Sequence, residues 1–475
     1  MSARLGAKVR AHRRKLGLSQ VELAKRLGIS ASYLNLIEHE QRPLTAELLI
    51  KVAGELQLDL SELASDTDAR LASDLVEIFS DPFFDEHQLN AADVRELAQT
   101  SPSLSRAVLS LYAGFRAARA SAEELAVRIY DDQERAPDGF DVDRARMPSE
   151  EVNDFVQRRM NYFPEMEEAA SALWRDAGLE VGARYRGMVR YLEHRGIEVV
   201  VGGVGTHRGA LRRFDVDRRR ISLSEALPPH SRNFQLAVQI GLITQEAVIE
   251  GILAQSGFNT EASRSLTRLV LANYFAGAVL MPYRAFLGAA RGERFDVELL
   301  GHRFGTSFEQ VCHRLTTLRE PGQEGIPFHM IRVDLAGNIS KRFSASGIHF
   351  ARFSGACSRW NVFTAFQTPG RIRTQVSIMP GGEKYFCIAR TVPKGRGGYH
   401  APQSTLALGL GCRLDHARDL VYADGVNLDM EGVPVGVTCR LCDRKDCEQR
   451  AVPSLRHPLR IDENVRGLSF FTPAD

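Results

Sequence analysis

Cysteine is missing from the first 311 residues of this 475-residue chain, and a long apolar run is missing from all of it. The seven cysteines begin at Cys312, and three of them fall between Cys439 and Cys447. This odd, uneven set excludes the disulfide framework of a small secreted domain and indicates metal-binding or redox chemistry. No apolar run approaches the roughly 18 residues that cross a bilayer. Residues 1–15 are basic and lack a signal-peptide core, so we expect a cytoplasmic protein with no membrane partner.

The chain also lacks a strong net charge, low-complexity tracts and fixed-period repeats. With a net charge of +2, whole-chain electrostatics indicate no partner. The length exceeds what one hydrophobic core supports, so we predict a multidomain protein, mainly α with α+β parts. The predicted parts are a helix-turn-helix domain at 1–65, a helical segment with a linker at 66–150, an α+β domain at 151–325 and a β-rich cysteine domain at 326–475.

Positive charge is concentrated near the N-terminus. Residues 4–42 hold nine basic and three acidic side chains, a pattern typical of a surface that faces phosphates. Short helices are predicted over 20–27 and 31–38, with Ser19 and Ser30 as N-caps and Gly28 where a positive φ ends the first helix. Two helices joined so tightly predict a helix-turn-helix. The apolar positions predicted to fill its core are Val21, Leu23, Ala24, Leu27, Ile29, Leu34, Ile37, Leu44, Leu49, Val52 and Leu56.

The segment from Leu16 to Thr45 resembles, without gaps, the Cro/repressor-type (XRE) helix-turn-helix. That resemblance implies phosphate contacts and side chains that enter the major groove of an operator. It also implies a homodimer or higher homo-oligomer on two half-sites. The alternative is a protein-docking helical bundle with a solvated basic face. The predicted DNA-binding residues are Gln20 and Arg42 for phosphates, Ser32, Tyr33 and Asn35 for bases, and Ser30 at the start of the second helix.

The middle of the chain is helical before an α+β pattern begins. Apolar residues recur at helical spacing from 71 to about 130, with Pro82 and Pro102 as breaks. Residues 131–151 are charged, contain two prolines and lack periodicity, which predicts a linker. A further helical region, 155–195, precedes two predicted strands, and a long helix is then predicted over 230–249.

The helix over 230–249 and the two predicted helices that follow resemble the ImmA/IrrE family of zinc-metallopeptidase-like domains. Active members need two histidines four residues apart and a glutamate that acts as general base. This chain has Val238, Gln239 and Leu242 at those positions. The resemblance therefore implies a degenerate zincin-like domain and no enzyme activity. The lone histidines His302 and His313 are expected to be structural.

The region after residue 326 is β-rich, with strands predicted within 328–344, 371–380 and 384–392. It ends in a C-x2-C-x4-C pattern of Cys439, Cys442 and Cys447, a spacing that lets three thiolates converge on a metal. A fourth ligand has to come from Cys357 or Cys412, both in glycine-bearing segments expected to be loops. Zinc and a [4Fe-4S] cluster both fit this spacing, and reduced cysteines without a metal are the plain alternative. Cys312 and Cys387 are expected in the core.

The order of these three domains resembles the short-chain fatty acyl transcriptional regulators (ScfR), a family that includes the PrpR and RamB regulators of propionate, methylcitrate and glyoxylate metabolism. The resemblance covers nearly the whole chain and includes the motifs around Cys357, Cys412 and Cys439. It implies a DNA-binding transcription regulator whose effector is a short-chain acyl-CoA, and a [4Fe-4S] cluster held by Cys357, Cys439, Cys442 and Cys447. For the effector's phosphates the sequence offers Arg184, Arg186 and Arg190. An ImmA-like regulatory protease, and a redox or iron sensor in which the cluster is the primary signal, are the alternatives.

Overall fold

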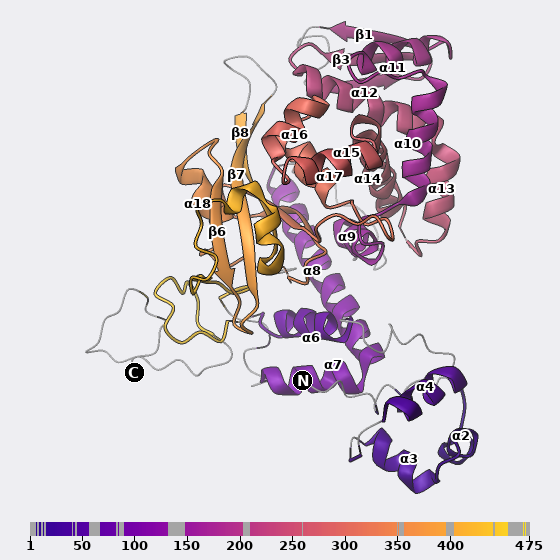
Figure 1. Ribbon diagram of the computed structural model, residues 1–475, viewed down its shortest axis with the longest axis vertical. Coiled ribbons are helices and arrows are strands. Elements are labelled where there is room, and N and C mark those ends of the chain that lie inside the picture. The colour runs from indigo at the N-terminus through magenta and orange to yellow at the C-terminus, as the bar shows by residue number, and fades with distance from the viewer. Residues whose placement is uncertain are drawn as a thin grey trace. The chain divides into compact units, whose positions relative to one another are not determined.

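The computed structural model describes residues 6, 9, 10, 13, 16–39, 41–42, 45–56, 67–81, 84, 90–131, 148–202, 210–258, 260–348, 350, 356–395, 403–439, 442–454, 469 and 471. Packing divides the chain into two compact units, Met1–Tyr112 and Ala113–Asp475. The first is helical where it is described, and the second carries two sheets (Figure 1).

The first unit begins with the predicted helix-turn-helix, and its local signals are confirmed. Ser19 and Ser30 cap the two helices with their side chains, and Gly28 ends the first at φ 70°. Burial of apolar residues from all three helices forms a small core. Val21 was expected in this core, but its side chain is 67% exposed because α2 turns that position to solvent. Leu44 lies outside the described residues. The helices are α2 (Gln20–Leu27), α3 (Ala31–Glu38) and α4 (Ala46–Glu55).

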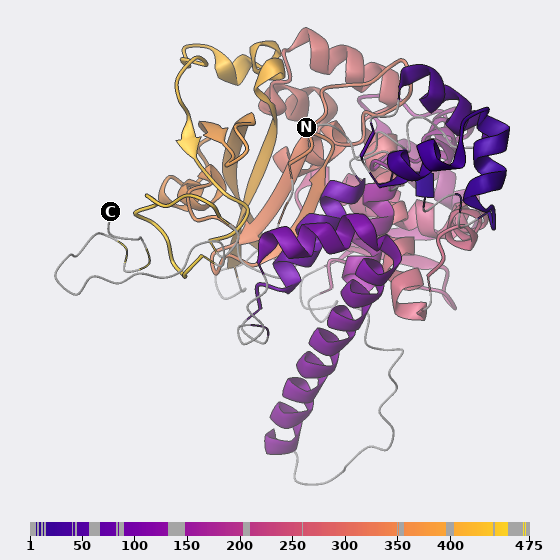
Figure 2. The same ribbon diagram turned by 90° about the horizontal axis from the view of Figure 1, so that it is seen from below.

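Three more helices follow. The helix α6 (Thr67–Ile78) packs against α7 (Ala91–Thr100), and the hydroxyl of Tyr112 donates to Asp81 at 2.5 Å. Pro102 was expected to break the helical pattern, and it opens the long helix α8 (Pro102–Asp131), because the first position of a helix needs no amide hydrogen. Figure 2 shows α8 as one long rod.

The predicted linker at 131–151 is wrong at its C-terminal end. Residues 132–147 lie outside the described residues, but α9 (Pro148–Arg158) already begins at Pro148. Proline and two acidic residues suit the first turn of a helix. The carboxylates of that turn also have partners in the fold: Glu151 accepts from Ser263 Oγ at 2.6 Å and Glu150 pairs with Arg342.

The helical half of the second unit carries a small sheet at its edge, with the strand order β1-β3-β2 (Figure 1). Its predicted strands are confirmed as β1 (Glu198–Gly202) and β3 (Arg220–Ser224), and β2 (Arg212–Asp215) had not been predicted. The predicted helix over 230–249 is two helices that meet at 72°, with Gln245 at the C-cap position of the first and the N-cap position of the second. The helices of this half are α10 (Pro164–Asp176), α11 (Arg184–Glu193), α12 (Pro229–Thr244), α13 (Glu246–Ala254), α14 (Glu261–Leu280), α15 (Tyr283–Gly292), α16 (Val297–Phe304) and α17 (Phe308–Leu315).

A six-stranded sheet with the order β5-β4-β8-β7-β6-β9 forms the other half of the second unit. Its three predicted strand regions are confirmed. The strand β8 was missed because its glycine-rich sequence is atypical of strands. One core lies between this sheet and α15–α17, and a second lies on the side of the short helix α18 (Asn361–Thr364). The strands are β4 (His329–Asp334), β5 (Ile339–Ser344), β6 (Arg373–Ile378), β7 (Lys384–Gly395), β8 (Gln403–Arg413) and β9 (Val433–Pro434).

Within the described residues, no single helix is long and apolar enough to cross a membrane, although two bent helix pairs reach that length and composition when joined.

Candidate DNA-binding and cysteine sites

The outer surface of α3 carries the polar side chains predicted to meet bases. Ser32 and Asn35 are exposed and Tyr33 is half-buried. Ser30 is exposed but also caps α3 by accepting from the amide of Tyr33 at 3.1 Å. Arg42 is exposed after the helix. The structure therefore leaves α3 free to present these groups to a groove.

Gln20, in α2, is connected to α3 by hydrogen bonds. Its Nε2 donates to Asn35 Oδ1 at 3.2 Å and to Glu38 Oε2 at 2.7 Å. Glu38 is buried and also accepts a two-pronged ion pair from Arg13, with Nε–Oε1 at 2.6 Å and Nη2–Oε2 at 2.9 Å. Arg13 Nη1 donates to the carbonyl of Leu18 at 2.7 Å. The sequence analysis did not predict this network, because Arg13 and Glu38 are 25 residues apart and their pairing is set by the fold.

The degenerate zincin positions lie in a packed interior. Val238 and Gln239 are 2% and 7% exposed in α12, and Leu242 packs against the same core. Helix α12 lies close to α14, since a Cβ on Gly241 would stand 2.8 Å from Phe275 Cδ1. A valine and a leucine cannot ligate zinc, and a neutral amide cannot take a proton from water. The positions of the family's zinc ligands and general base are therefore filled by side chains that pack in the helical core.

Two candidate groups of this half are structural. Arg184 was offered for phosphates, but it is 6% exposed and donates to the carbonyls of Leu280, at 2.6 Å, and Phe304. His313 is half-buried, and its removal from water, together with the charge of Lys341, lowers its pKa well below the usual value.

An open cleft lies nearby, lined by His230, His302 and Arg390 among others. Burial and the charge of Lys394 lower the pKa of His230. Sequence reasoning had not selected His230, because a single histidine at the start of a helix carries no spacing signal.

The four cysteines predicted as ligands line one small cavity. Cys357 follows a segment outside the described residues, and Cys439, Cys442 and Cys447 lie after β9. The described lining also includes Ser358, Thr438, Gln449 and Arg450 but no carboxylate. Four thiols without a carboxylate suit a thiophilic centre. Among the residues that the structure describes, no three His, Cys, Asp or Glu side chains are arranged to hold a metal ion.

Arg450 organises the cysteine loop. Its guanidinium donates to the carbonyls of Cys439 at 2.8 Å, Cys442 at 3.3 Å and Arg444. It is 5% exposed and lines the cysteine cavity. The sequence had suggested Arg450 only as a neighbouring positive charge. Its contacts make it a positioning group for the backbone that carries two of the thiols.

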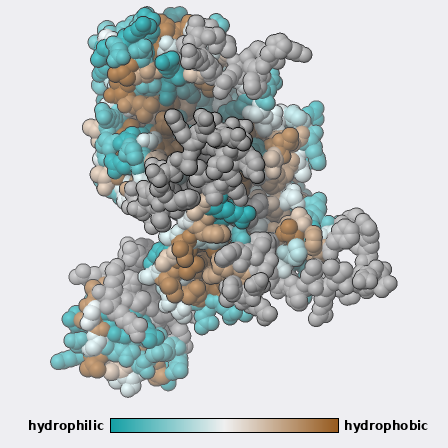
Figure 3. Space-filling model, turned by 180° about the vertical axis from the view of Figure 1, so that it is seen from behind, coloured by the Kyte–Doolittle hydropathy of each residue, from teal (hydrophilic) through white to brown (hydrophobic). Residues whose placement is uncertain are grey.

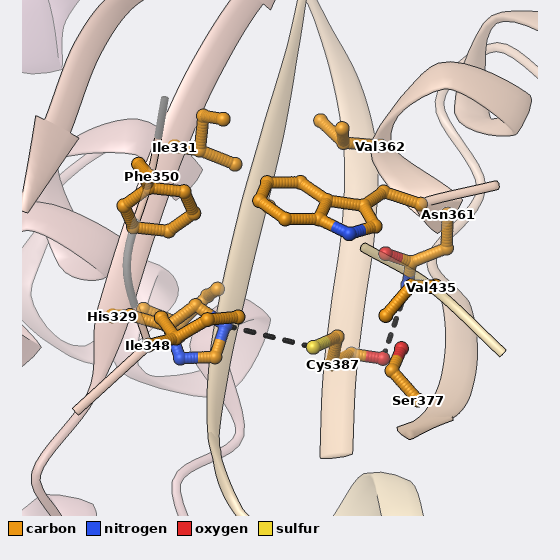
Figure 4. Close-up of a pocket in the computed structure, with 12 residues that line it drawn as sticks. His329, Ile331, Ile348, Phe350, Asn361, Val362, Ser377, Cys387 and Val435 are labelled. Carbon is orange, nitrogen blue, oxygen red and sulfur yellow. Dashed lines mark hydrogen bonds between the residues drawn. The ribbon is translucent and has the colours of Figure 1, made fainter. Parts of the chain in front are cut away.

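The remaining cysteines lie elsewhere. Cys412 was expected in a loop, but it is a fully buried residue of β8, opposite Phe386 of β7. The two glycines that precede it, Gly409 and Gly411, made the segment resemble a loop. Cys312 is buried in the core as expected. Cys387 is only half-buried; it lines a second cavity, where its sulfur lies 3.5 Å from His329 Nε2 (Figure 4).

Comparison with known proteins places these sites in a family. Family models match three successive regions: helix-turn-helix at residues 9–63, the IrrE N-terminal-like domain at 192–316, and the C-terminal domain of the short-chain fatty acyl coenzyme A regulators at 317–471. The HTH-type transcriptional regulator PrpR of Mycobacterium tuberculosis is 40% identical over 97% of this chain and 94% of its own length. The chain belongs to the short-chain fatty acyl coenzyme A regulator family.

Other members of the family support this assignment. The propionyl-CoA carboxylase regulator of Cereibacter sphaeroides is 40% identical, covering 98% of this regulator and 97% of that protein. A solved structure titled Mycobacterium tuberculosis transcriptional regulator aligns with a TM-score of 0.66 and 42% identity, covering 69% of this chain and all of that one. The regulator is thus a DNA-binding transcription factor of the helix-turn-helix type and not an enzyme.

Proposed function

We propose that this regulator binds operator DNA through α3 and that a short-chain acyl-CoA changes its affinity for the operator. The observation that carries the proposal is the joining, in one chain, of an exposed polar recognition helix to the C-terminal domain of this family. One relative is named for regulating propionyl-CoA carboxylase, so propionate metabolism is the proposed target. Adding propionyl-CoA, but not CoA, to a regulator–operator complex should change the dissociation constant; equal effects of the two would contradict the proposal.

The predicted DNA contacts divide into two classes with different tests. Asn35 is proposed to contact a base edge, so Asn35→Ala should relax sequence preference at one position of each half-site, by about 1–3 kcal/mol. Arg42 is proposed to contact a phosphate, so Arg42→Ala should weaken all sequences alike and reduce the salt dependence of binding. The two variants serve as controls for each other, and an identical loss in both would contradict this division.

The cysteine cavity is proposed to hold a [4Fe-4S] cluster on Cys357, Cys439, Cys442 and Cys447. The shared cavity and the absence of a carboxylate in its described lining support this donor set. Such a cluster accepts four thiolates and absorbs near about 400 nm. Cys357→Ala and Cys442→Ala should lose that absorption in anaerobically purified protein, whereas Cys412→Ala, a matched change outside the cavity, should keep it. A colourless protein with one bound zinc would favour the zinc alternative.

Whether the cluster or the acyl-CoA is the primary signal is tested with the same complex. If operator binding responds to propionyl-CoA equally with and without the cluster, the cluster is structural. If operator binding collapses on exposure to air without any effector, the cluster is the sensor and the acyl-CoA proposal fails as the primary signal.

Self-association is proposed through α8. Leu104, Leu111 and Phe115 are 56%, 75% and 39% exposed and recur on one face of the helix at spacings of seven and four residues. Figure 3 shows hydrophobic side chains gathered over this helical segment. Exposed apolar patches of this kind mark association surfaces. Leu111→Glu should shift the regulator from dimer to monomer in analytical ultracentrifugation, whereas Arg106→Glu should not; a dimer unaffected by Leu111→Glu would contradict this surface.

A further inference from the structure

The cysteine cavity has one cationic side chain in its described lining, that of Arg450, which is 5% exposed. The rest of the described lining consists of the four cysteines and the neutral side chains of Ser358, Thr438 and Gln449. Two of the cysteines, Cys357 and Cys442, are each 7% exposed, so little water reaches this guanidinium. An arginine keeps its positive charge in such surroundings, and a charge acts strongly on its neighbours where water is excluded.

The guanidinium of Arg450 has a nitrogen without an acceptor. Its Nη1 donates to the carbonyl of Cys439 at 2.8 Å, and its Nη2 donates to the carbonyls of Cys442, at 3.3 Å, and Arg444. Its Nε is buried and makes no hydrogen bond within the described structure. A buried donor without a partner costs about 1–3 kcal/mol, and more when the group is charged. An acceptor inside the cavity would therefore be stabilised by this N–H.

The neighbouring Arg444 shows how an arginine is bonded when it only holds the backbone. Its Nε donates to the carbonyl of Val435 at 3.3 Å, and its Nη2 donates to the carbonyl of Ile378 at 2.7 Å. Arg444 is not among the described residues that line the cysteine cavity. Arg450 differs from it in two respects, because it lines the cavity and has an unused N–H.

Sulfur is the acceptor that an occupied cavity would supply. The four cysteines are proposed to hold a [4Fe-4S] cluster, and hydrogen bonds to the sulfurs of such a cluster help to set its reduction potential. A hydrogen bond donated by a cationic group stabilises most the form with the greatest negative charge, which is the reduced form. The described lining contains no carboxylate that would compete for the N–H.

We propose that Arg450 Nε donates a hydrogen bond to a sulfur of the cluster and thereby stabilises the reduced state of the site. The inference rests on the proposed function, because it needs the cluster on the four cysteines of this cavity. Arg450 then has two roles: Nη1 and Nη2 hold the backbone of the cysteine loop, and Nε raises the potential at which the site accepts an electron.

The variant Arg450→Lys isolates this hydrogen bond, because lysine keeps the positive charge but has a methylene in place of Nε. In anaerobic titrations of the full chain with dithionite, followed by electron paramagnetic resonance, its midpoint potential should be lower by about 59 mV. That shift corresponds to an about tenfold loss in the relative stability of the reduced state for one electron, as expected for one hydrogen bond to a charged group. Gln449→Met, which removes an exposed amide from the same lining, should keep the parental potential at equal iron per chain.

A second measurement is informative even if Arg450→Lys does not retain its cluster. In parent protein labelled with ¹⁵N-arginine, electron–nuclear double resonance of the reduced site should show coupling to an arginine nitrogen, because an N–H···S hydrogen bond carries spin density to the donor. The segment from Cys439 to Arg450 contains two other arginines, Arg440 and Arg444. The coupling should persist in Arg440→Lys and in Arg444→Lys.

The outcomes separate this inference from the function on which it rests. If the parent protein binds no iron–sulfur cluster, the proposed cofactor fails and this inference fails with it. If the cluster is present but shows no arginine coupling, or if Arg450→Lys keeps the parental potential at full iron content, Arg450 only holds the backbone and the proposed cluster stands. Loss of the coupling in Arg440→Lys or Arg444→Lys would assign the hydrogen bond to that arginine and overturn the proposal.

Discussion

Replacing Glu38 by glutamine should destabilise the helix-turn-helix more than any exposed substitution on its surface. The carboxylate has no exposed surface and is held by two bonds from Arg13, whose side chain is 8% exposed. Removing one member of a buried pair leaves the other charge uncompensated, which costs about 3–5 kcal/mol. The core beneath it is small, so this loss is a large share of the 5–15 kcal/mol that holds a typical domain folded.

The loss is best measured by hydrogen exchange, because a chain of two compact units does not unfold in one step. In Glu38→Gln, amide protection within α2 and α3 should fall by about two to three orders of magnitude. The double variant Arg13→Met with Glu38→Leu replaces both charges by apolar groups and should recover most of the protection.

Operator binding separates two roles of Glu38: the stabilising ion pair with Arg13 and the acceptor for the Gln20 side chain. The double variant is stable but no longer offers Gln20 the acceptor that lies 2.7 Å from its Nε2. Its affinity for DNA fragments selected by the parent protein should therefore remain about tenfold lower, the loss of about one charge-assisted hydrogen bond. Unchanged protection in Glu38→Gln would refute the buried pair. Parental operator affinity in the double variant would refute the orientation of Gln20 by Glu38.

Three further results are expected. Gly411→Ala should lower the unfolding free energy of the second unit by about 1–3 kcal/mol, because its Cβ would stand 2.5 Å from His329 Nε2 and 2.7 Å from Cys387 Sγ. Urea unfolding followed by tryptophan emission reports on that unit, since both tryptophans lie in it; a change below experimental error would contradict this packing. If the proposed cluster is present, Arg450→Met should reduce the iron bound per chain at equal protein yield, and full iron content would show that the cysteine loop holds its shape without this guanidinium. Burial acts to raise the pKa of Glu309, but Lys394 and Arg332 outweigh it and lower the pKa to about 2, so about 3 kcal/mol of stability present above pH 4.5 should be lost as the pH falls to 2. Glu309→Gln should flatten that part of the pH profile for urea unfolding of the second unit, followed by tryptophan emission.

Local signals in the sequence predicted the parts of the fold that depend on neighbouring residues. Ser19, Gly28 and Ser30 set the ends of α2 and α3 through interactions within four residues, so their roles were readable. The spacing of Cys439, Cys442 and Cys447 is equally local, and these residues share a cavity.

Features that depend on distant contacts were not readable. The strand β8 was not recognised because it contains glycines. Gly411 is needed there because His329 approaches it too closely to leave room for a side chain. Arg184 looked like a surface cation, and only the fold shows that it is buried against two carbonyls from other helices. Trp360 carried no sequence signal, because whether its Nε1 has an acceptor depends on residues that are distant in the sequence. The domain boundaries at 65/66, 150/151 and 325/326 stay a prediction.

The cysteine cavity and the second cavity, which Cys387 and Trp360 line, are joined by backbone hydrogen bonds. Trp360 N donates to the carbonyl of Cys357 at 3.2 Å, and Cys357 N donates to the carbonyl of Val437 at 3.1 Å, two residues beyond Val435 of the second cavity. The same few peptide units therefore support both linings. A substitution that displaces these peptide units should change the shape of both cavities at once.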